Sequence, residues 1–401
     1  DRSRFATAFD KQLGRLIVTV AQAAVLNQAA FAQLTAEESD YILMRPERFF
    51  YPDGEHFRFL SAPTHTQVKI LQIARKIDFK RLLSAALMVA DAVDHFSNFV
   101  RQEGQRHGNR LFFNGQPDTT DIVLQLSTPI GLIVILGQGD NTFDGSAAVV
   151  IDLGGNDRYR KPIASALQKP GQVSIAIDIQ GNDRYTQRKQ PFTQGFGCLG
   201  IGLQVDLEGS DAYYSGNMAQ GCGLFGVGVL ADLDGEDTYT MDLMGQGFGL
   251  FGIGLLLDAS GNDRYLMAGM GQGTGTTMGC GVLADIGGND KYLADRHRKS
   301  GALKPDRWCH VQGTGLSIRS PNWAKSLSFY GGIGILSEGG GDDFYHATGG
   351  HCMGSSYFMS VGALVDHGGD DKYIPESGYG VGFAVHLSNA ALIDHSGNDF
   401  Y

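Results

Sequence analysis

The chain is 401 residues long and contains 57 glycines, 11 prolines and a formal net charge of −11. Its length suits two or three ordinary domains, or one domain with a long repeat array. The few prolines exclude collagen, the 42% hydrophobic content argues against disorder, and the negative charge disfavours nucleic acid and anionic membranes as partners. A cation, a sugar or another protein is the expected partner.

Residues 1–118 are predicted to form a helical N-terminal region. Within residues 68–96 the apolar positions recur every three or four residues, as expected for helices that bury one face. Residues 48–60 place Pro-Asp-Gly between aromatic-rich runs and predict a hairpin. The apolar run at residues 16–33 ends in Ala-Phe-Ala, as a signal peptide does. We interpret it as a retained helix, too short and too polar to span a membrane, and we predict an exported protein without transmembrane segments.

Residues 119–401 are dominated by a repeat. Nine clear copies approximate Gly-x-Gly-x-Leu-x-Asp-x-x-Gly-Asn-Asp-x-Tyr, most of them at steps of 26 to 28 residues. Each copy supplies a leading acid, a second acid and a tyrosine, and these three names are kept below. The leading acids are Asp152, Asp178, Asp206, Asp232, Asp258, Asp285, Glu338, Asp366 and Asp394. The second acids are Asp157, Asp183, Asp211, Asp237, Asp263, Asp290, Asp343, Asp371 and Asp399. The tyrosines are Tyr159, Tyr185, Tyr213, Tyr239, Tyr265, Tyr292, Tyr345, Tyr373 and Tyr401.

A short strand is expected before each leading acid. The residues one, three and five places before the acid are mostly aliphatic, and so usually is the residue two places before it. Strands with two apolar faces tend to be covered on both. Units of this length suit a parallel β-solenoid, whereas the blades of a β-propeller need roughly forty residues. We therefore predict a mainly β protein, a parallel β-solenoid (β-helix) of about nine coils with an N-terminal α-helical region.

Stacked coils place the acids in two columns, with neighbouring charges ~4.8 Å apart that repel one another. Two explanations remain open. In the first, each acid caps its own turn by accepting backbone N–H groups, and the adjacent Arg and Lys residues neutralise part of the column. In the second, the carboxylates bind calcium, which prefers oxygen ligands. The candidate calcium ligands are the second acids Asp157, Asp183, Asp211, Asp237, Asp263 and Asp290.

The segments GGNDRY (154–159), GGNDKY (287–292) and GGDDKY (368–373) carry a family resemblance. They are similar to the repeats of the calcium-binding repeat-in-toxin solenoids, whose nine-residue Gly-Gly-x-Gly-x-Asp units stack into a parallel β-roll. The resemblance implies a β-solenoid with bound calcium. It covers about six residues per coil, and that family's units follow one another directly, whereas here one copy occurs per coil.

Two further columns are interpreted as structural. The tyrosines are expected to stack into a ladder that stabilises the turn. The glutamines of the QGxG motif are expected to form a ladder of hydrogen-bonded amides. These glutamines are Gln194, Gln220, Gln246, Gln272 and Gln312.

The repeat is interrupted between Asp285 and Glu338, which lie 53 positions apart. Because the QGxG motif still occurs between them, we predict one coil with two insertions, near residues 293–308 and 317–330. The inserted residues are basic and aromatic, which suits an anionic glycan or an acidic partner surface; the alternative is a pair of solvated loops. The candidate ligand-binding residues are Arg296, Arg298, Lys299, Arg319 and Trp323.

The five cysteines follow no CxxC spacing, which excludes a disulfide framework and haem attachment. Cys309-His310 and His351-Cys352 occupy similar places in neighbouring coils. Stacking is expected to set Cys309 beside His351 and His310 beside Cys352. Three interpretations remain open. The four side chains form a zinc site if they converge, or one Cys–His pair acts as a nucleophile with its base, or all four are ordinary core residues.

These patterns favour a non-enzymatic solenoid for binding or assembly, stabilised by calcium, that presents a repetitive surface to a protein or glycan. We expect another chain, or further residues, to cover the last coil or the second apolar face. The alternative is a carbohydrate-active enzyme, similar to a polysaccharide lyase, that acts on an acidic glycan at the loops of residues 293–330.

Overall fold

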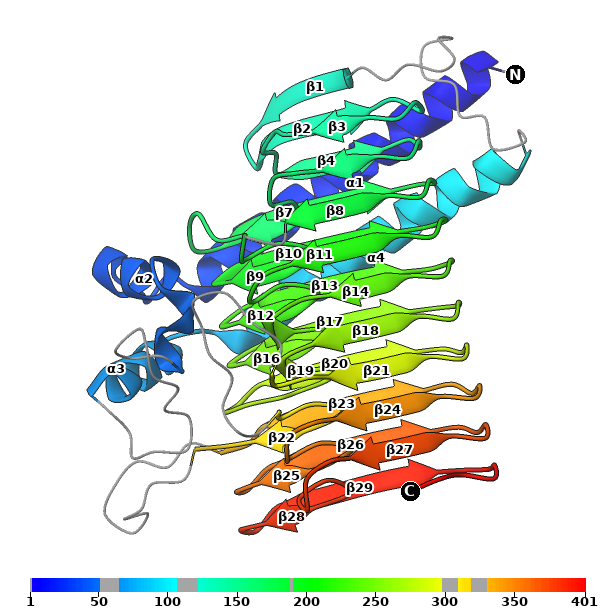
Figure 1. Ribbon diagram of the computed structural model, residues 1–401. Coiled ribbons are helices and arrows are strands. Elements are labelled where there is room, and N and C mark those ends of the chain that lie inside the picture. Colours follow the sequence, from blue (N-terminus) through cyan, green and yellow to red (C-terminus); the bar gives the residue numbers. More distant parts are fainter. Residues whose placement is uncertain (1, 51–64, 107–121, 188–189, 298–308, 319–329) are drawn as a thin grey trace.

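The computed structural model describes residues 2–50, 65–106, 122–187, 190–297, 309–318 and 330–401. It confirms the predicted fold class: an N-terminal helical region is followed by a parallel β-solenoid whose coils are stacked from β1 to β29 (Figure 1). Two long helices run along the upper coils in Figure 1, and two short helices lie beside them.

The helical region has short connections with clear local signals. Thr35 begins the second helix with a capping box, because its side chain accepts the Glu38 N–H while the Glu38 carboxylate accepts the Thr35 N–H. Asp78 accepts the Arg81 N–H and so caps the start of the last helix, and the preceding helix ends at Ala74. The described helices are α1 (Arg2–Ala30), α2 (Ala36–Leu43), the 3-10 helix η1 (Pro46–Phe49), α3 (His65–Ala74) and α4 (Phe79–Arg106).

Two predictions from the sequence concern residues that lie partly or wholly outside the described ones. The start of the hairpin predicted at residues 48–60 falls in η1, and most of the rest lies in residues 51–64, which are outside the described residues. The boundary predicted between residues 118 and 119 lies between α4 and β1, also outside them.

Each coil contributes one strand to a long sheet that carries the leading acids, here named the leading-acid sheet. Its first pair is antiparallel and its other pairs are parallel. In spatial order its described strands are β1 (Ile122–Thr128), β2 (Gly131–Leu136), β4 (Val149–Asp152), β7 (Gln172–Asp178), β10 (Gly200–Asp206), β13 (Val227–Asp232), β17 (Ile253–Asp258), β20 (Cys280–Asp285), β23 (Ile333–Glu338), β26 (Val361–Asp366) and β29 (Asn389–Asp394).

A second sheet carries the tyrosines, and short sheets form the remaining side. The tyrosine sheet contains β3 (Thr142–Phe143), β5 (Arg158–Tyr159), β8 (Arg184–Gln187), β11 (Ala212–Ser215), β14 (Thr238–Thr240), β18 (Arg264–Met267), β21 (Lys291–Ala294), β24 (Phe344–Ala347) and β27 (Lys372–Pro375). The short sheets contain β6 (Ser165–Ala166), β9 (Phe196–Cys198), β12 (Cys222–Leu224) and β16 (Phe248–Leu250); β15 (Leu243–Gly245) and β19 (Gly269–Gly271); and β22 (Gly315–Leu316), β25 (Ser356–Tyr357) and β28 (Ala384–Val385).

The coils stack in register with the repeat. Asp206 is paired with Asp178 on one side and with Asp232 on the other, and Tyr213 is paired with Tyr185 and Tyr239. Successive tyrosine rings from Tyr159 onward are parallel, with centroids 4.6 Å to 5.0 Å apart. β20 pairs directly with β23, so the long interval is a single coil, as predicted.

The leading-acid sheet is apolar on both faces. The residue two places before each acid, such as Leu256, points into the solenoid and packs with the tyrosines. The residues one, three and five places before it face outward, where Ile175 and Leu203 join the core of the helical region. The predicted second covered face therefore exists, and α1 and α4 cover it over the early coils.

Candidate functional site

Most leading acids cap their own turns. In seven of the nine, a carboxylate oxygen of the leading acid accepts the N–H two residues later, as from Gly287 to Asp285 at 3.1 Å and from Gly368 to Asp366 at 3.0 Å. Asp178 and Asp206 are the exceptions, and their Oδ1 atoms accept no N–H or hydroxyl donor among the described residues. The other carboxylate oxygen accepts tyrosine hydroxyls, as between Tyr185 and Asp206 at 2.7 Å. This arrangement confirms the capped-turn prediction for seven of the leading acids.

The second acids form a continuous buried column. The N–H of one second acid donates to Oδ1 of the second acid in the next coil, as from Asp183 to Asp211 at 2.5 Å and from Asp237 to Asp263 at 2.6 Å. From Asp157 to Asp371 their Oδ2 atoms are buried and accept no N–H or hydroxyl donor among the described residues. Their side chains lie within hydrogen-bonding reach of the leading acids of the same turns, as Asp237 does of Asp232. The six predicted calcium ligands, Asp157, Asp183, Asp211, Asp237, Asp263 and Asp290, all belong to this column, and each is at most 3% exposed.

Burial disfavours the charged form of these carboxylates. It raises the pKa of Asp178 to about 7, of Asp237 to about 8 and of Asp263 to about 10. The basic residues beside the second acids, such as Arg184 and Arg264, are exposed instead, and no ion pair of the described residues joins them to either column. The expectation that they neutralise the columns was therefore wrong, because alternate residues of a strand point to opposite faces.

The columns offer cation ligands of one chemical type. Groups of three acids, such as Asp178, Asp183 and Asp206, bring carboxylate oxygens within 4.8 Å of one another. Calcium prefers such oxygen ligands and takes six to eight of them. Each group therefore fits calcium in the type of donor and supplies part of the number that it needs.

The tyrosine column matches its prediction, whereas the ladder of amides predicted for the glutamines is wrong. Their Nε2 atoms donate mostly to backbone oxygens, and among the described residues one amide–amide bond joins two glutamines of the motif. The tyrosines form the stacked ladder described above. Each glutamine of the QGxG motif is buried, and Gln246 Nε2 donates to the backbone oxygen of Tyr239 at 3.1 Å and to Gln220 Oε1 at 3.2 Å. These groups hold the coils together and are not presented to a ligand.

The Cys–His segments stack differently from the prediction. His310 lies on His351 with ring centroids 5.1 Å apart, so histidine faces histidine and not cysteine. Burial lowers the pKa of His351 to about 4 and raises the pKa of Cys309 to about 11. A nucleophilic pair needs a thiolate and a base that takes a proton. Neutral, buried Cys309, His310, His351 and Cys352 are therefore arranged as core residues.

Of the five candidate ligand-binding residues of the predicted basic patch, the structure describes Arg296 alone. The Arg296 N–H donates to Thr348 Oγ1 at 3.0 Å, and its side chain contacts His297 at 3.2 Å. The other candidates, Arg298, Lys299, Arg319 and Trp323, lie outside the described residues.

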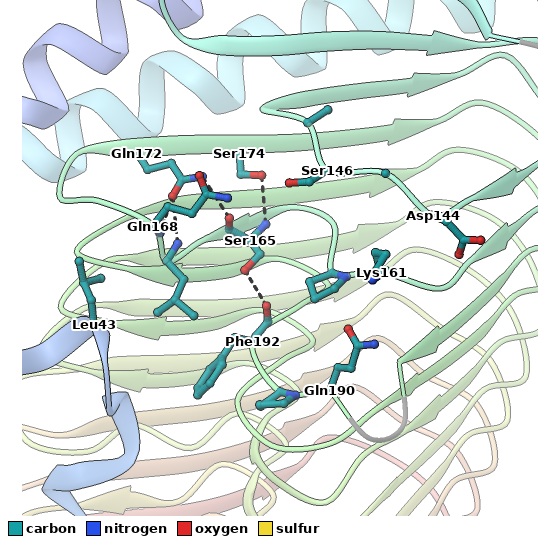
Figure 2. A pocket seen from close by; sticks show the side chains of 15 residues that line it. Leu43, Asp144, Ser146, Lys161, Ser165, Gln168, Gln172, Ser174, Gln190 and Phe192 are labelled. Carbon is teal, nitrogen blue, oxygen red and sulfur yellow. Dashed lines mark hydrogen bonds between the residues drawn. The ribbon is translucent and has the colours of Figure 1, made fainter. Parts of the chain in front are cut away.

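One cavity was missed by sequence reasoning. It has a volume of about 700 Å³ and lies among the early coils, with Leu43 at the end of α2 and Asp144 at opposite ends (Figure 2). Gln172 and Ser174 line it and occupy places where the next coil has Gly200 and Gly202. That departure from the glycine pattern was the signal that could have located it.

Comparisons with known proteins gave no match, whether with family models, curated proteins or solved structures. The assignment of a function therefore depends on the geometry described above. Among the described helices, none is sufficiently long and apolar to cross a membrane.

Proposed function

We propose that this protein is a non-enzymatic assembly protein whose leading-acid sheet binds a second copy of the same chain. The observation that carries the proposal is the outer face of this sheet, which stays apolar along the solenoid while the described helices cover only its early coils.

The covered part of the face is closely packed. Asn27 on α1 donates to the backbone oxygen of Gln172 at 3.2 Å, and Arg101 on α4 donates to that of Leu207 at 3.2 Å. The outward residues five places before the acid are 1% exposed at Ile201 and 5% at Val227.

Beyond β13 the same positions are progressively uncovered. The residue equivalent to Ile201 is half-buried at Ile253, 41% exposed at Ile333 and 42% exposed at Val361. Leu255 and Ile335, two places further along their strands, are half-buried. Burying such residues in a contact stabilises it by about 25 cal/mol per Å² of apolar area.

A second copy of the chain is the occupant that this face favours. In a two-fold contact one patch meets itself, so it needs apolar character and an absence of like charges. The outward positions of β17, β20, β23 and β26 are aliphatic, Cys or Ser, and none is charged. A protein with a net charge of −11 can therefore meet itself there without direct repulsion.

Light scattering after size exclusion tests the proposal. We expect a dimer at micromolar concentration, and Ile333→Lys with Val361→Lys, which sets like charges against each other across a two-fold contact, should convert it to a monomer with an unchanged circular-dichroism spectrum. Leu87→Lys, on the exposed side of α4 at 72% exposure, is the matched control and should remain dimeric. A wild-type protein that is monomeric at every concentration would refute the proposal.

We also propose that the acid columns bind divalent cations, with calcium as the favoured ion. The carboxylate oxygens of the two columns, which lie within 4.8 Å of one another, and the buried Oδ2 atoms that accept no N–H or hydroxyl donor support this second proposal. Equilibrium dialysis followed by elemental analysis should find calcium in the wild type and less in Asp237→Asn. Glu236→Gln, an exposed acid of the same turn, is the control. Protein without bound metal after dialysis against calcium would exclude the cation.

The lyase-like alternative has less support. It depends on the basic residues of the loops near residues 293–330, of which the structure describes Arg296 alone among the candidates. Export likewise remains a proposal, supported by the apolar run of residues 16–33, and fractionation of cells that make the protein tests it.

A further inference from the structure

The cavity in Figure 2 exists because one coil, that of β7, departs from the repeat. At Gly202 and Gly228 an added Cβ atom would lie 2.1 Å from the backbone oxygens of Phe196 and Cys222, so these coils close tightly. Ser174 is paired with Gly202, and Gln172 with Gly200. A side chain at these places holds the coil open.

The wall of the cavity is fixed by hydrogen bonds. Gln172 Oε1 accepts the N–H groups of Leu167 at 3.1 Å and Gln168 at 2.8 Å. Ser174 Oγ accepts the Ser165 N–H at 3.1 Å, and the Ser165 hydroxyl donates to the backbone oxygen of Phe192 at 2.6 Å (Figure 2). The cavity is therefore formed before any ligand arrives, which lowers the entropic penalty of binding.

The lining combines apolar side chains with uncharged polar groups. Its volume of about 700 Å³ falls in the range of small-molecule sites. Asp144 lies 3.8 Å from Arg160, so its charge is already partly balanced, and the Lys161 side chain is exposed. The apolar side chains are those of Leu43, Pro162, Pro191 and Phe192, and the uncharged polar groups are those of Ser146, Ser165, Gln168, Gln172, Ser174 and Gln190.

We propose that this cavity binds a neutral saccharide. The ring faces of a sugar are apolar and suit Phe192 and the prolines, while its hydroxyls both donate and accept, as do the Gln168 amide and the Ser146 hydroxyl. Among the lining residues that the structure describes, a charged ligand would meet no buried opposite charge. The site is independent of the proposed dimer contact, since it lies in the coils of β4 and β7 and not in those of β23 and β26.

Isothermal titration calorimetry with cellohexaose, maltohexaose and N-acetylchitohexaose tests the site, and trigalacturonate serves as the charged comparison. We expect at least one neutral hexamer to bind and trigalacturonate to bind at least tenfold more weakly. Gln168→Ala should weaken binding about tenfold by removing hydrogen bonds. Ser146 is exposed, and Ser146→Trp should fill the cavity and abolish saccharide binding. Gln33→Ala, also at an exposed position, is the control and should leave saccharide binding unchanged.

Thermal melting shows whether each variant is folded. If Ser146→Trp does not fold, the saccharide affinity of Gln168→Ala decides whether the cavity is the binding site. Absence of binding by all three neutral hexamers would overturn the proposal. So would binding that is unchanged in the folded variants, or equal binding of trigalacturonate. The dimer proposal stands or falls separately, because it is measured by molecular mass.

Discussion

The hydroxyl of Tyr185 lies 2.7 Å from Oδ2 of Asp206 in the next coil and 3.4 Å from Oδ2 of Asp178 in its own. A single phenol thus contacts the leading acids of two successive coils. Similar contacts join Tyr213 to Asp232 at 2.7 Å and to Asp206 at 3.3 Å. The tyrosine ladder therefore connects the coils by hydrogen bonds as well as by ring stacking.

Removing one hydroxyl should destabilise the solenoid measurably. Tyr213→Phe leaves the buried Oδ2 of Asp232 without its tyrosine donor, while Asp206 keeps that of Tyr185, and we expect a loss of about 1–3 kcal/mol in the free energy of unfolding. Tyr214→Phe, at a half-buried neighbouring position, should change it by less than about 0.5 kcal/mol. Urea denaturation followed by circular dichroism gives both values, and equal losses would contradict the role of the ladder.

The acid columns predict an unusual dependence of stability on pH. Because burial raises the pKa of Asp178 and Asp258 to about 7, the folded state binds protons that the unfolded state, with a pKa of about 3.9, has lost. This contribution is complete below about pH 4 and disappears as the pH rises through 7.

In chelator, the melting temperature should therefore be higher at pH 5 than at pH 8. Added calcium should raise it at pH 8 and have little effect at pH 5, if cations replace the protons. A chelated protein that melts higher at pH 8 would contradict the raised pKa values.

The solenoid interior should be sensitive to truncation. Leu256 is fully buried among the tyrosine and leucine columns, so Leu256→Ala should cost about 2–5 kcal/mol. Leu87→Ala on the exposed side of α4 is the control and should cost little. Chemical denaturation measures both, and a small loss for Leu256→Ala would indicate that the interior repacks.

Thiol reactivity should separate Cys280 from the other cysteines. Cys280 is half-buried, whereas Cys198, Cys222, Cys309 and Cys352 are buried. Iodoacetamide at pH 8 should label Cys280 first, and the others only after denaturation, because burial raises their pKa. Mass spectrometry locates the label, and rapid labelling of native Cys309 would revive the nucleophile hypothesis.

The period of the sequence was sufficient to predict the stacked columns. A residue that recurs once per coil must lie over its counterpart, so the acids, tyrosines and glutamines were placed correctly. The pairing of His310 was not, because the following coil has Met353 and Gly354 where Gln312 and Gly313 stand, with similar positive φ angles of 50° and 57° at Met353 and Gln312. Placing Cys309-His310 over His351-Cys352 therefore shifted the segment by one residue.

The extent of the covered face was beyond sequence reasoning, and the cavity left only the loss of two glycines as a signal in the sequence. How far α1 and α4 extend along the sheet depends on tertiary contacts such as that between Arg101 and Leu207. The cavity depends on the joint effect of Gln172 and Ser174 on one coil, and neither residue has a periodic counterpart.

The uniform columns also make the pairing of coils nearly interchangeable. A folding chain that skipped one coil would still set Asp on Asp and Tyr on Tyr, and would loop out about one repeat at modest entropic cost. Contacts made by particular coils, such as those of α1 with β7 and α4 with β13, therefore determine which coil pairs with which. Correct assembly should begin where the helices dock and proceed coil by coil toward β29.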